Sequence, residues 1–411
     1  TQCLHIMFKS EAFNIDGIRT PIGKLKGSLS SIRADDLAAI PIKELLKRNP
    51  ELDPASVEDV ILGCANQAGE DNRNVARMAA LLAGLPVSVP GETVNRLCAS
   101  GMSATIRAFH AIKAGEGDVF LTGGVEHMTR GPIVLGKGNT PYSGTTEMYD
   151  STFGWRFVNP KMHEMHGTDG MGMTAENVVE MHKISREDQD KFAAWSQQKA
   201  GAARDSGRLA KEIVKVEIPQ RKGDPIVFEH DEFMRPDSTA EILGKLRPAF
   251  KKDGSVTAGN ASGLNDGAGA LLIASGSAVE KYGFKPKARI VASAVSGIEP
   301  RIMGLGPVEA TQKALKRAGL SLDDMDIIEL NEAFAGQSLG VTRKLGLKDN
   351  DSRLNPNGGA IAIGHPLGMT GQRLLQTATI ELHENSDNKY ALCTLCVGVG
   401  QGFAVVLEVV K

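Results

Sequence analysis

Apolar and polar residues follow two different periods along most of the chain. Short apolar runs at residues 12–18 and 57–62 are typical of buried strands. Between them, Leu37, Ile40 and Leu45 recur at the spacing of one helix face. This alternation of strands and helices favours a parallel sheet covered by helices. The same pattern predicts helices over residues 75–83, 102–112, 174–182 and 186–206, and strands over 92–95, 118–124 and 270–274.

The periodicity weakens in the middle of the chain. Residues 131–170 are rich in Gly, Pro, Thr, Tyr and Met, and residues 221–252 are charged and irregular. We interpret residues 131–265 as an insertion over the sheet, because long non-periodic segments in a compact protein usually serve as lids or binding loops. The glycine-rich segment 259–269 closes the insertion. Its glycines would allow close approach to a ligand, or would form a tight turn before the strand at 270–274.

After residue 285 the alternation resumes and resembles the first part of the chain. The spacing that aligns Asp59 with Asp326, in two similar strands, also aligns Cys98 with His365. The chain therefore resembles one βα unit used twice. Two such halves would bring equivalent strand ends together, which is the usual place for a ligand in an open α/β sheet. We expect three parts: an N-terminal half over residues 1–130, an insertion over 131–265 followed by the last strand of that half to about 280, and a C-terminal half over 286–411.

Composition adds the constraints of an ordinary globular protein. The 411 residues suggest two or three domains at roughly 100–200 residues each. A net charge of -2 gives no electrostatic argument for nucleic acid or an anionic membrane as partner. No apolar run approaches the roughly 20 residues of a membrane span. Glycine is abundant, at 46 residues, and aromatic residues are 5% of the chain, which favours tight backbone approaches over stacking platforms.

Cysteine usage indicates a reducing compartment. The five cysteines are an odd number and are spread thinly, which argues against a disulfide framework. Residues 3–8 are too short and too weakly basic for a secretory signal, and we interpret the first residues as an unstructured lead-in or a cloning remnant. No organelle address is visible, and we therefore expect a cytoplasmic protein.

Cys98 is the first candidate for chemistry. A short extended run turns sharply at this residue and leads into a segment with helical apolar spacing. The positive end of a helix favours an anion, so a thiol there is expected to ionise more readily than a free one, and the thiolate is the nucleophile. The alternative is a small buried apolar cysteine, which is the commoner fate of a lone one.

Three further residues fall at equivalent or adjacent positions of the two halves. Asn331 follows a strand over 327–330, His365 lies in a Gly/Pro-rich loop, and Cys396 ends the last strand but one. A cysteine with a sequence-distant histidine is the ordinary basis of an activated thiolate. A second cysteine would serve a reaction that makes or breaks a C–C bond beside a thioester, because the enolate carbon needs its own acid or base. Gly398 and the small residues around it leave N–H groups free to hold an oxyanion.

Two other readings involve metals or redox chemistry. Cys393 and Cys396 form a C-x-x-C pair, but zinc would need two more ligands at suitable spacing, and the segment is apolar and strand-like. His163 and His166 have the i, i+3 spacing of a possible ligand pair, and we favour histidines on a surface loop. We therefore expect no metal site.

Four motifs together resemble the thiolase family over residues 11–411. They are NRLCASG at 95–101, NEAFAGQ at 331–337, GHPLG at 364–368 and CVGVG at 396–400. The resemblance implies a five-layered αβαβα fold of two duplicated halves, a loop domain that holds coenzyme A, and homodimers or homotetramers. Within the family, the residues at 123–126, 154–160 and 398–402 look most like the 3-oxoadipyl-CoA thiolases of aromatic-acid breakdown.

The resemblance also implies a reaction and roles. A 3-oxoacyl-CoA would be cleaved by coenzyme A, as co-substrate and with no permanently bound cofactor. Cys98 would carry the acyl group, His365 would be its base, and Cys396 would be the acid and base for acetyl-CoA and coenzyme A. His365 and a water on Asn331 would hold the enolate oxygen, and the N–H groups of Cys98 and Gly398 the tetrahedral one. By position in the family, the contacts to coenzyme A would be Met171, Arg235, Phe250, Ala261, Ser262, Gly263 and Phe334.

The alternatives concern the substrate and the reaction. Gly170 stands where many acetoacetyl-CoA thiolases have a histidine, which argues against an acetoacetyl-CoA thiolase working in the Claisen direction. A dicarboxylic acyl chain would need a cation, with Arg156 and His163 as candidates. A decarboxylating ketoacyl synthase would lack the second cysteine. A non-enzymatic acyl-CoA or lipid carrier would not depend on Cys98.

Overall fold

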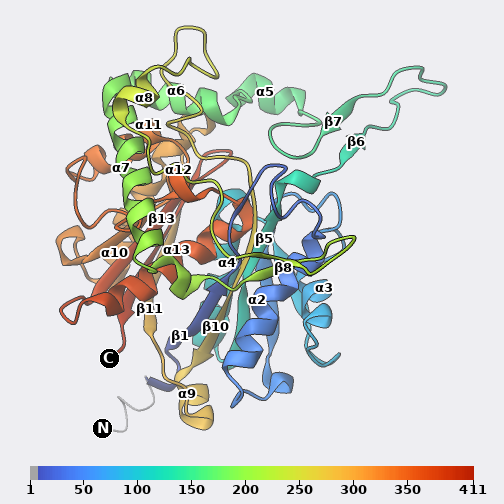
Figure 1. Ribbon diagram of the computed structural model, residues 1–411, viewed down its shortest axis with the longest axis vertical. Coiled ribbons are helices and arrows are strands. Elements are labelled where there is room, and N and C mark those ends of the chain that lie inside the picture. Colours follow the sequence, from blue (N-terminus) through green and yellow to red (C-terminus); the bar gives the residue numbers. More distant parts are fainter. Residues whose placement is uncertain (1–7) are drawn as a thin grey trace.

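The computed structural model describes residues 8–411, so that the predicted lead-in lies largely outside the described residues. A ten-stranded sheet crosses the molecule in the order β12-β13-β14-β11-β1-β10-β5-β3-β4, with β2 paired to β10 (Figure 1). The strands are β1 Ala12–Arg19, β2 Gly23–Lys24, β3 Asp59–Gly63, β4 Gly91–Val94, β5 Val119–His127, β6 Ile133–Leu135, β7 Met148–Asp150, β8 Val216–Ile218, β9 Ile226–Phe228, β10 Asn265–Ser275, β11 Ala288–Gly297, β12 Ile327–Leu330, β13 Tyr390–Val397 and β14 Gln401–Val409. The α-helices are α2 Ala34–Arg48, α3 Val75–Leu82, α4 Ser100–Ala114, α5 Pro160–His166, α6 Met171–His182, α7 Arg186–Asp205, α8 Ala240–Gly244, α9 Gly276–Tyr282, α10 Gly306–Ala318, α11 Ala335–Lys344, α12 Ala360–Ile363 and α13 Leu367–Glu384.

The sheet consists of two halves with the same strand order. From its centre, one half runs β1-β10-β5-β3-β4 and the other runs β11-β14-β13-β12. Beyond β12, Leu354 forms a parallel bridge with Ile328 of β12. This bridge corresponds to the parallel pairing of β4 with β3 at the edge of the other half. The internal repeat predicted from the sequence is thus visible as a repeated topology.

The expectation of a parallel sheet is wrong. Among the strands of residues 8–411, the pairs β3–β4, β3–β5 and β12–β13 are parallel, and the remaining strand pairs are antiparallel. In each half the last strand is antiparallel to both its neighbours: β10 lies between β1 and β5, and β14 lies between β11 and β13. Helical crossovers produce the parallel pairs, while β14 follows β13 through a short turn and β10 returns from the insertion.

Helices divide the molecule into five layers. The central layer is α4 and α13, which pack against each other and lie between the two halves of the sheet. On the outer faces, α2 and α3 cover the first half, and α10 covers β11 and β14. Buried apolar residues form one large cluster beneath each outer helix layer and one around the central helices, which is why these amphipathic segments adopt this order. The predicted αβαβα arrangement is confirmed.

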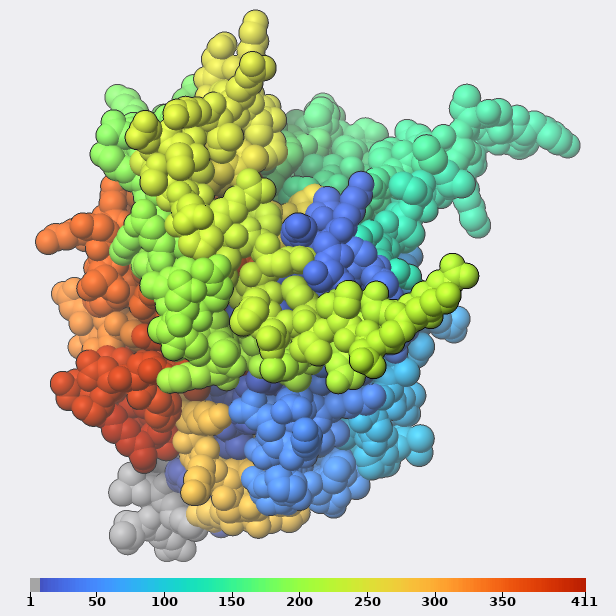
Figure 2. All heavy atoms as spheres, viewed as in Figure 1, coloured from blue at the N-terminus to red at the C-terminus, as the bar shows by residue number. Residues whose placement is uncertain are grey.

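The insertion contains more regular structure than its weak periodicity predicts. Strands β6 and β7 form a hairpin that projects clear of the rest of the molecule (Figures 1 and 2). Strands β8 and β9 form a second hairpin, and α6 and α7 pack beside α11. His163 and His166 lie on the short helix α5 and not on a loop, although both side chains are exposed as expected.

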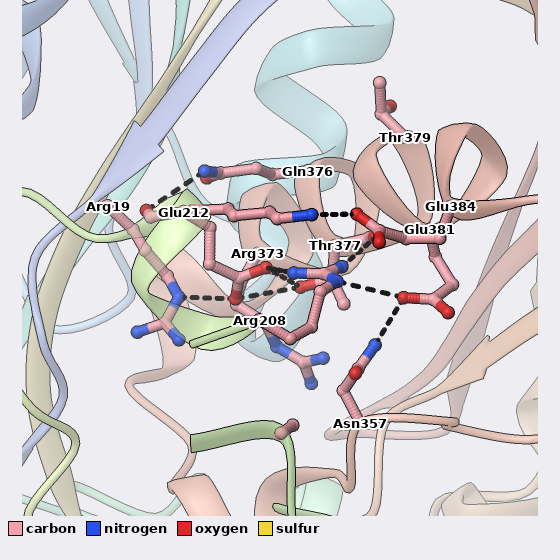
Figure 3. Close-up of polar contacts among 12 residues, drawn as sticks. Arg19, Arg208, Glu212, Asn357, Arg373, Gln376, Thr377, Thr379, Glu381 and Glu384 are labelled. Atoms are coloured by element: carbon pink, nitrogen blue, oxygen red, sulfur yellow. Dashed lines mark hydrogen bonds and ion pairs between the residues drawn. The ribbon is translucent and has the colours of Figure 1, made fainter. Parts of the chain in front are cut away.

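A buried network of charges fastens the insertion to both halves (Figure 3). Arg19, at the end of β1, pairs with Glu212 at 2.9 Å and with Asp231 at 2.7 Å, and all three side chains are fully buried or nearly so. Glu212 also accepts from Arg208 at 3.2 Å, and Arg208 reaches Glu381 of α13 at 3.0 Å. One carboxylate of the insertion therefore compensates cations from two elements.

Removing the charge of Glu212 should destabilise the protein strongly. In Glu212→Gln, Arg19 and Arg208 lose a buried partner, and breaking such a pair typically costs about 3–5 kcal/mol. Chemical denaturation should show this loss in the free energy of unfolding. Glu187→Gln, which breaks the exposed pair with Lys191, is the matched control and should unfold like the wild type. Equal stability of both variants would contradict this account of the network.

Candidate active site

Cys98 lies where the sequence predicts it, between a strand end and a helix start. Strand β4 ends at Val94, a single 3-10 turn spans Leu97–Ala99, and α4 begins directly afterwards. Leu97, next to Cys98, has φ +46°, and Val399, in the turn between β13 and β14, has φ +62°. Left-handed backbone is costly for branched residues and is found chiefly where the surrounding structure enforces it, often at functional sites.

The Cys98 thiol is buried and neutral. Its residue is 8% exposed, and burial raises the pKa of the thiol to about 11, although the N–H of Gly398 and the N–H of Cys98 itself bind the sulfur and oppose the rise. The expectation of a thiol that ionises readily is therefore wrong for the protein without substrate, because desolvation outweighs the dipoles. The two N–H groups named for an oxyanion hole do meet at this sulfur.

His365 is held in one orientation by its neighbours. The hydroxyl of Thr370 donates to the carbonyl oxygen of Pro366 (2.9 Å), so its oxygen is left to accept from His365 Nδ1, at 2.7 Å. The proton of the neutral ring is thus assigned to Nδ1, which leaves Nε2 as the basic nitrogen. Nε2 lies 3.4 Å from Nδ2 of Asn331. The N–H of His365 donates to Oδ1 of Asn265 at 2.9 Å, which fixes the loop.

The imidazole of His365 is kept neutral. Burial lowers its pKa to about 3, and the positive charge of Arg373 acts in the same direction. Arg373 is itself buried on α13 and pairs with Glu329 at 2.9 Å. A neutral imidazole can accept a thiol proton once a substrate stabilises the resulting charges.

Cys396 brings a second sulfur to the same place. It is fully buried on β13, and both burial and the nearby sulfur of Cys98 raise the pKa of its thiol, which therefore stays protonated at neutral pH. Cys393 lies on the other face of β13, where its sulfur contacts the carbonyl oxygen of Leu374 at 3.5 Å. Residues three apart on a strand face opposite sides, so this C-x-x-C segment does not direct its two sulfurs to a shared site.

A cavity of about 440 Å³ leads to Cys98. Gly398 and Met171 line it near the sulfur, and Arg156 comes from the insertion. His163, the other cation considered for a dicarboxylic chain, does not line this cavity. The residues around it are Ala65, Asn66, Leu97, Cys98, Glu126, residues 151–157, Gly170, Met171, Leu367, Gly398 and Val399. A thiol at the end of a largely apolar cavity can accept an acyl group.

The residues named for coenzyme A include a cluster around Cys396, two exposed positions and two residues of a loop beside Ala333. Met171 lines the cavity and, with Ala261 and Phe334, belongs to the apolar cluster around Cys396. Phe250 is half-exposed, and its ring meets that of Phe334 edge-on with centroids 6.2 Å apart. Arg235 is exposed, and its backbone N–H donates to Gln197. The remaining two lie in the loop beside Ala333: Ser262 donates its N–H to the Ala333 carbonyl, and Gly263 faces Phe233.

Several supporting residues were missed from the sequence. Thr370, Asn265 and Arg373 act on His365 through a hydrogen bond to its ring, a hydrogen bond to its backbone and a charge. Glu126 joins the two halves, since its carboxylate accepts the N–H groups of Ala65, Asn66 and Gly368. Asn265 and Glu126 lie in segments that were singled out from the sequence, at 259–269 and 123–126, and Thr370 lies one turn beyond the Gly-His-Pro loop, but no individual role was assigned to any of them.

Comparisons with known proteins agree with this geometry. Residues 13–277 match the family model "Thiolase, N-terminal domain", and residues 284–409 match "Thiolase, C-terminal domain". The chain therefore belongs to the thiolase family, which makes it an acyltransferase. This confirms the predicted family and is at odds with the synthase and carrier alternatives.

Two curated relatives and one solved structure are similar over nearly the whole chain. The chain is 61% identical over 398 residues to the 3-oxoadipyl-CoA/3-oxo-5,6-dehydrosuberyl-CoA thiolase of Escherichia coli K12, covering 97% of this chain and 99% of the relative. It is 58% identical to a beta-ketoadipyl-CoA thiolase of Acinetobacter baylyi, with the same coverage. The human mitochondrial 3-ketoacyl-CoA thiolase in complex with CoA has a TM-score of 0.90 and 42% identity, covering 98% of this chain and 99% of that one.

Within residues 8–411, the structure contains no helix with the length and apolar character of a membrane span.

The protonation of His365 should make stability depend on pH. The unfolded histidine titrates near pH 6.5, and the folded one near 3, so below pH 6.5 only the unfolded chain gains this proton. Stability should therefore fall as pH drops from about 6.5 towards 3. Melting temperatures of His365→Asn should fall less over this range than those of the wild type. His166→Asn, which alters an exposed ring, is the control. A His365 variant with the wild-type pH dependence would contradict the assignment.

Proposed function

We propose that this protein cleaves 3-oxoadipyl-CoA with coenzyme A to acetyl-CoA and succinyl-CoA, through an acyl group carried by Cys98. The observation that carries the proposal is that Cys98 lines the cavity and lies close enough to Cys396, from the other half of the repeat, for the two sulfurs to interact. His365 comes two residues before α13, the helix that packs against the turn containing Cys98. The names of the relatives with 55–61% identity, which are 3-oxoadipyl- or beta-ketoadipyl-CoA thiolases, support the choice of substrate.

In the first half of the reaction, Cys98 attacks the 3-keto carbon. Nε2 of His365 takes the thiol proton, since Nδ1 already donates to Thr370. The N–H groups of Cys98 and Gly398, which both bind the sulfur, are placed to receive the developing oxyanion, and one such donor is typically worth around 3 kcal/mol in the transition state. Collapse of the tetrahedral species breaks the C2–C3 bond and leaves a succinyl thioester on Cys98.

The departing acetyl-CoA enolate needs a proton at carbon and a partner for its oxygen. Cys396 has the proton, because burial holds its thiol in the neutral form. The protonated His365 faces the enolate oxygen together with a water on Asn331. Oδ1 of Asn331 is buried and has no hydrogen-bond partner among residues 8–411, which supports this place for a water.

In the second half, coenzyme A releases the succinyl group. The Cys396 thiolate left by the first half removes the proton of the coenzyme A thiol, which attacks the thioester on Cys98. Succinyl-CoA forms, Cys98 leaves as the thiolate, and the protonated His365 returns the proton to it. Met171, Ala261 and Phe334 surround Cys396 and would contact the pantetheine arm. Neither half requires a metal or a redox cofactor, because the thioester itself acidifies the carbon. A homodimer or homotetramer and a cytoplasmic location stay predictions.

The substrate assignment is tested by initial rates of thiolysis. Loss of 3-oxoacyl-CoA absorbance on addition of coenzyme A should be fastest, as kcat/KM, for 3-oxoadipyl-CoA. Acetoacetyl-CoA and a long-chain 3-oxoacyl-CoA are the comparison substrates. A higher kcat/KM for either of them would overturn the substrate assignment and leave the thiolase mechanism intact.

Substitution of the three cysteines near the site should change activity to different extents, because we assign each a different role. Cys98→Ser should form no succinyl adduct and lose at least about 1,000-fold in kcat, because it lacks the nucleophile. Cys396→Ser should lose about 100- to 10,000-fold, the usual contribution of a general acid and base. Cys393→Ala, whose sulfur lies on the other face of β13, is the control and should keep its activity.

Intact-mass spectrometry after mixing each variant with 3-oxoadipyl-CoA, without free coenzyme A, measures the adduct directly. An adduct on Cys98→Ser, or an inactive Cys393→Ala, would contradict these roles.

A further inference from the structure

We propose that Arg156 binds the terminal carboxylate of the acyl chain and so selects dicarboxylic over monocarboxylic 3-oxoacyl-CoA substrates. This inference rests on the proposed function and names the residue that sets its specificity. Arg156 and Cys98 line the same cavity. Among the described residues that line it, Arg156 is the only arginine or lysine. The cavity therefore has a nucleophile and a single fixed cation.

The guanidinium has capacity for an additional acceptor. It is half-buried and donates to two neutral oxygens, Oδ1 of Asn66 at 3.1 Å and the carbonyl oxygen of Ser151 at 3.3 Å. Within residues 8–411 it forms no ion pair. An arginine carries five N–H donors in a planar fork that matches the two oxygens of a carboxylate, so donors remain for a ligand. Most other buried or half-buried arginines here have a carboxylate partner, as Arg19 and Arg373 do.

The neighbours of Arg156 hold it in place without neutralising it. Asn66 also donates to the hydroxyl of Ser151, so both partners of the guanidinium are tied to each other. Glu126 lines the same cavity, but its carboxylate is 2% exposed and accepts three backbone N–H groups, those of Ala65, Asn66 and Gly368. Burial raises the pKa of Glu126 to about 7, which further reduces its negative charge near neutrality. The positive charge of Arg156 therefore faces a cavity without a fully charged partner.

The rest of the lining explains why a cation there would discriminate. Leu97, Phe153 and Phe157 present apolar surface, on which a methyl-ended chain can also lie. A carboxylate in such surroundings loses hydration and needs a charged partner, whereas a methyl group leaves the guanidinium unpaired. Discrimination then comes from a charge-assisted hydrogen bond present with one substrate only, which is typically worth about 10- to 100-fold in kcat/KM.

The experiment compares two substrates that differ only at the chain end. 3-Oxohexanoyl-CoA has the length of 3-oxoadipyl-CoA and a methyl group in place of the carboxylate. Steady-state thiolysis of both is measured for the wild type, Arg156→Gln and Arg156→Lys. Arg221→Gln, which removes an exposed arginine outside the cavity, is the matched control.

We expect Arg156→Gln to lose about 10- to 100-fold in kcat/KM for 3-oxoadipyl-CoA and little for 3-oxohexanoyl-CoA. Arg156→Lys, which keeps the charge and loses the fork, should fall between it and the wild type. Asn66→Asp would place a competing carboxylate beside the guanidinium and should also lower the preference for the dicarboxylic substrate while Arg156 is present. Arg221→Gln should behave as the wild type.

Three outcomes would overturn the inference. Equal losses with both substrates would assign Arg156 to the structure of the loop, and a raised KM for coenzyme A with either substrate would assign it to the cofactor arm. An unchanged preference in Arg156→Gln would exclude any role in selection. A wild type without preference for 3-oxoadipyl-CoA over 3-oxohexanoyl-CoA is a different result, since it would refute the proposed substrate before any variant is made.

Discussion

The close packing of the two central helices, α4 and α13, is the constraint on which the site depends. A Cβ atom on Gly101 would lie 2.6 Å from the carbonyl oxygen of Gly368, and one on Gly371 would lie 2.3 Å from the nitrogen of Met102. Only residues without a side chain allow the helices to approach so closely. Because Cys98 precedes α4 and His365 precedes α13, this contact brings the proposed nucleophile of one half of the chain towards the proposed base of the other.

Burial then determines the chemistry of the groups that this packing brings together. Both thiols and the imidazole are neutral in the protein without substrate, and the loss of water around each group shifts its pKa further in favour of that neutral form. In this state both sulfurs carry a proton, and Nε2 of His365 is unprotonated and can accept one. In the proposed mechanism, charge appears only when a substrate carbonyl reaches the N–H groups of Cys98 and Gly398, which already bind the sulfur of Cys98.

Much of this could be predicted from the sequence because the motifs are local. Cys98, His365 and Cys396 each lie in a short segment whose glycines, prolines and apolar residues indicate a strand end or helix start. The pairing of β10 between β1 and β5 could not be predicted, because it joins segments separated by the whole insertion. The raised pKa of Cys98 was missed for a related reason, since its burial depends on residues from distant segments.

The central claim is that both halves of the chain act on one acyl group held by Cys98. The most direct measurement is a crystal structure of the enzyme exposed to 3-oxoadipyl-CoA in the absence of free coenzyme A. The account predicts an acyl group bonded to the sulfur of Cys98, its carbonyl oxygen against the N–H of Gly398 and its chain inside the cavity. An acyl group on another side chain, or a chain that leaves the cavity empty, would contradict it.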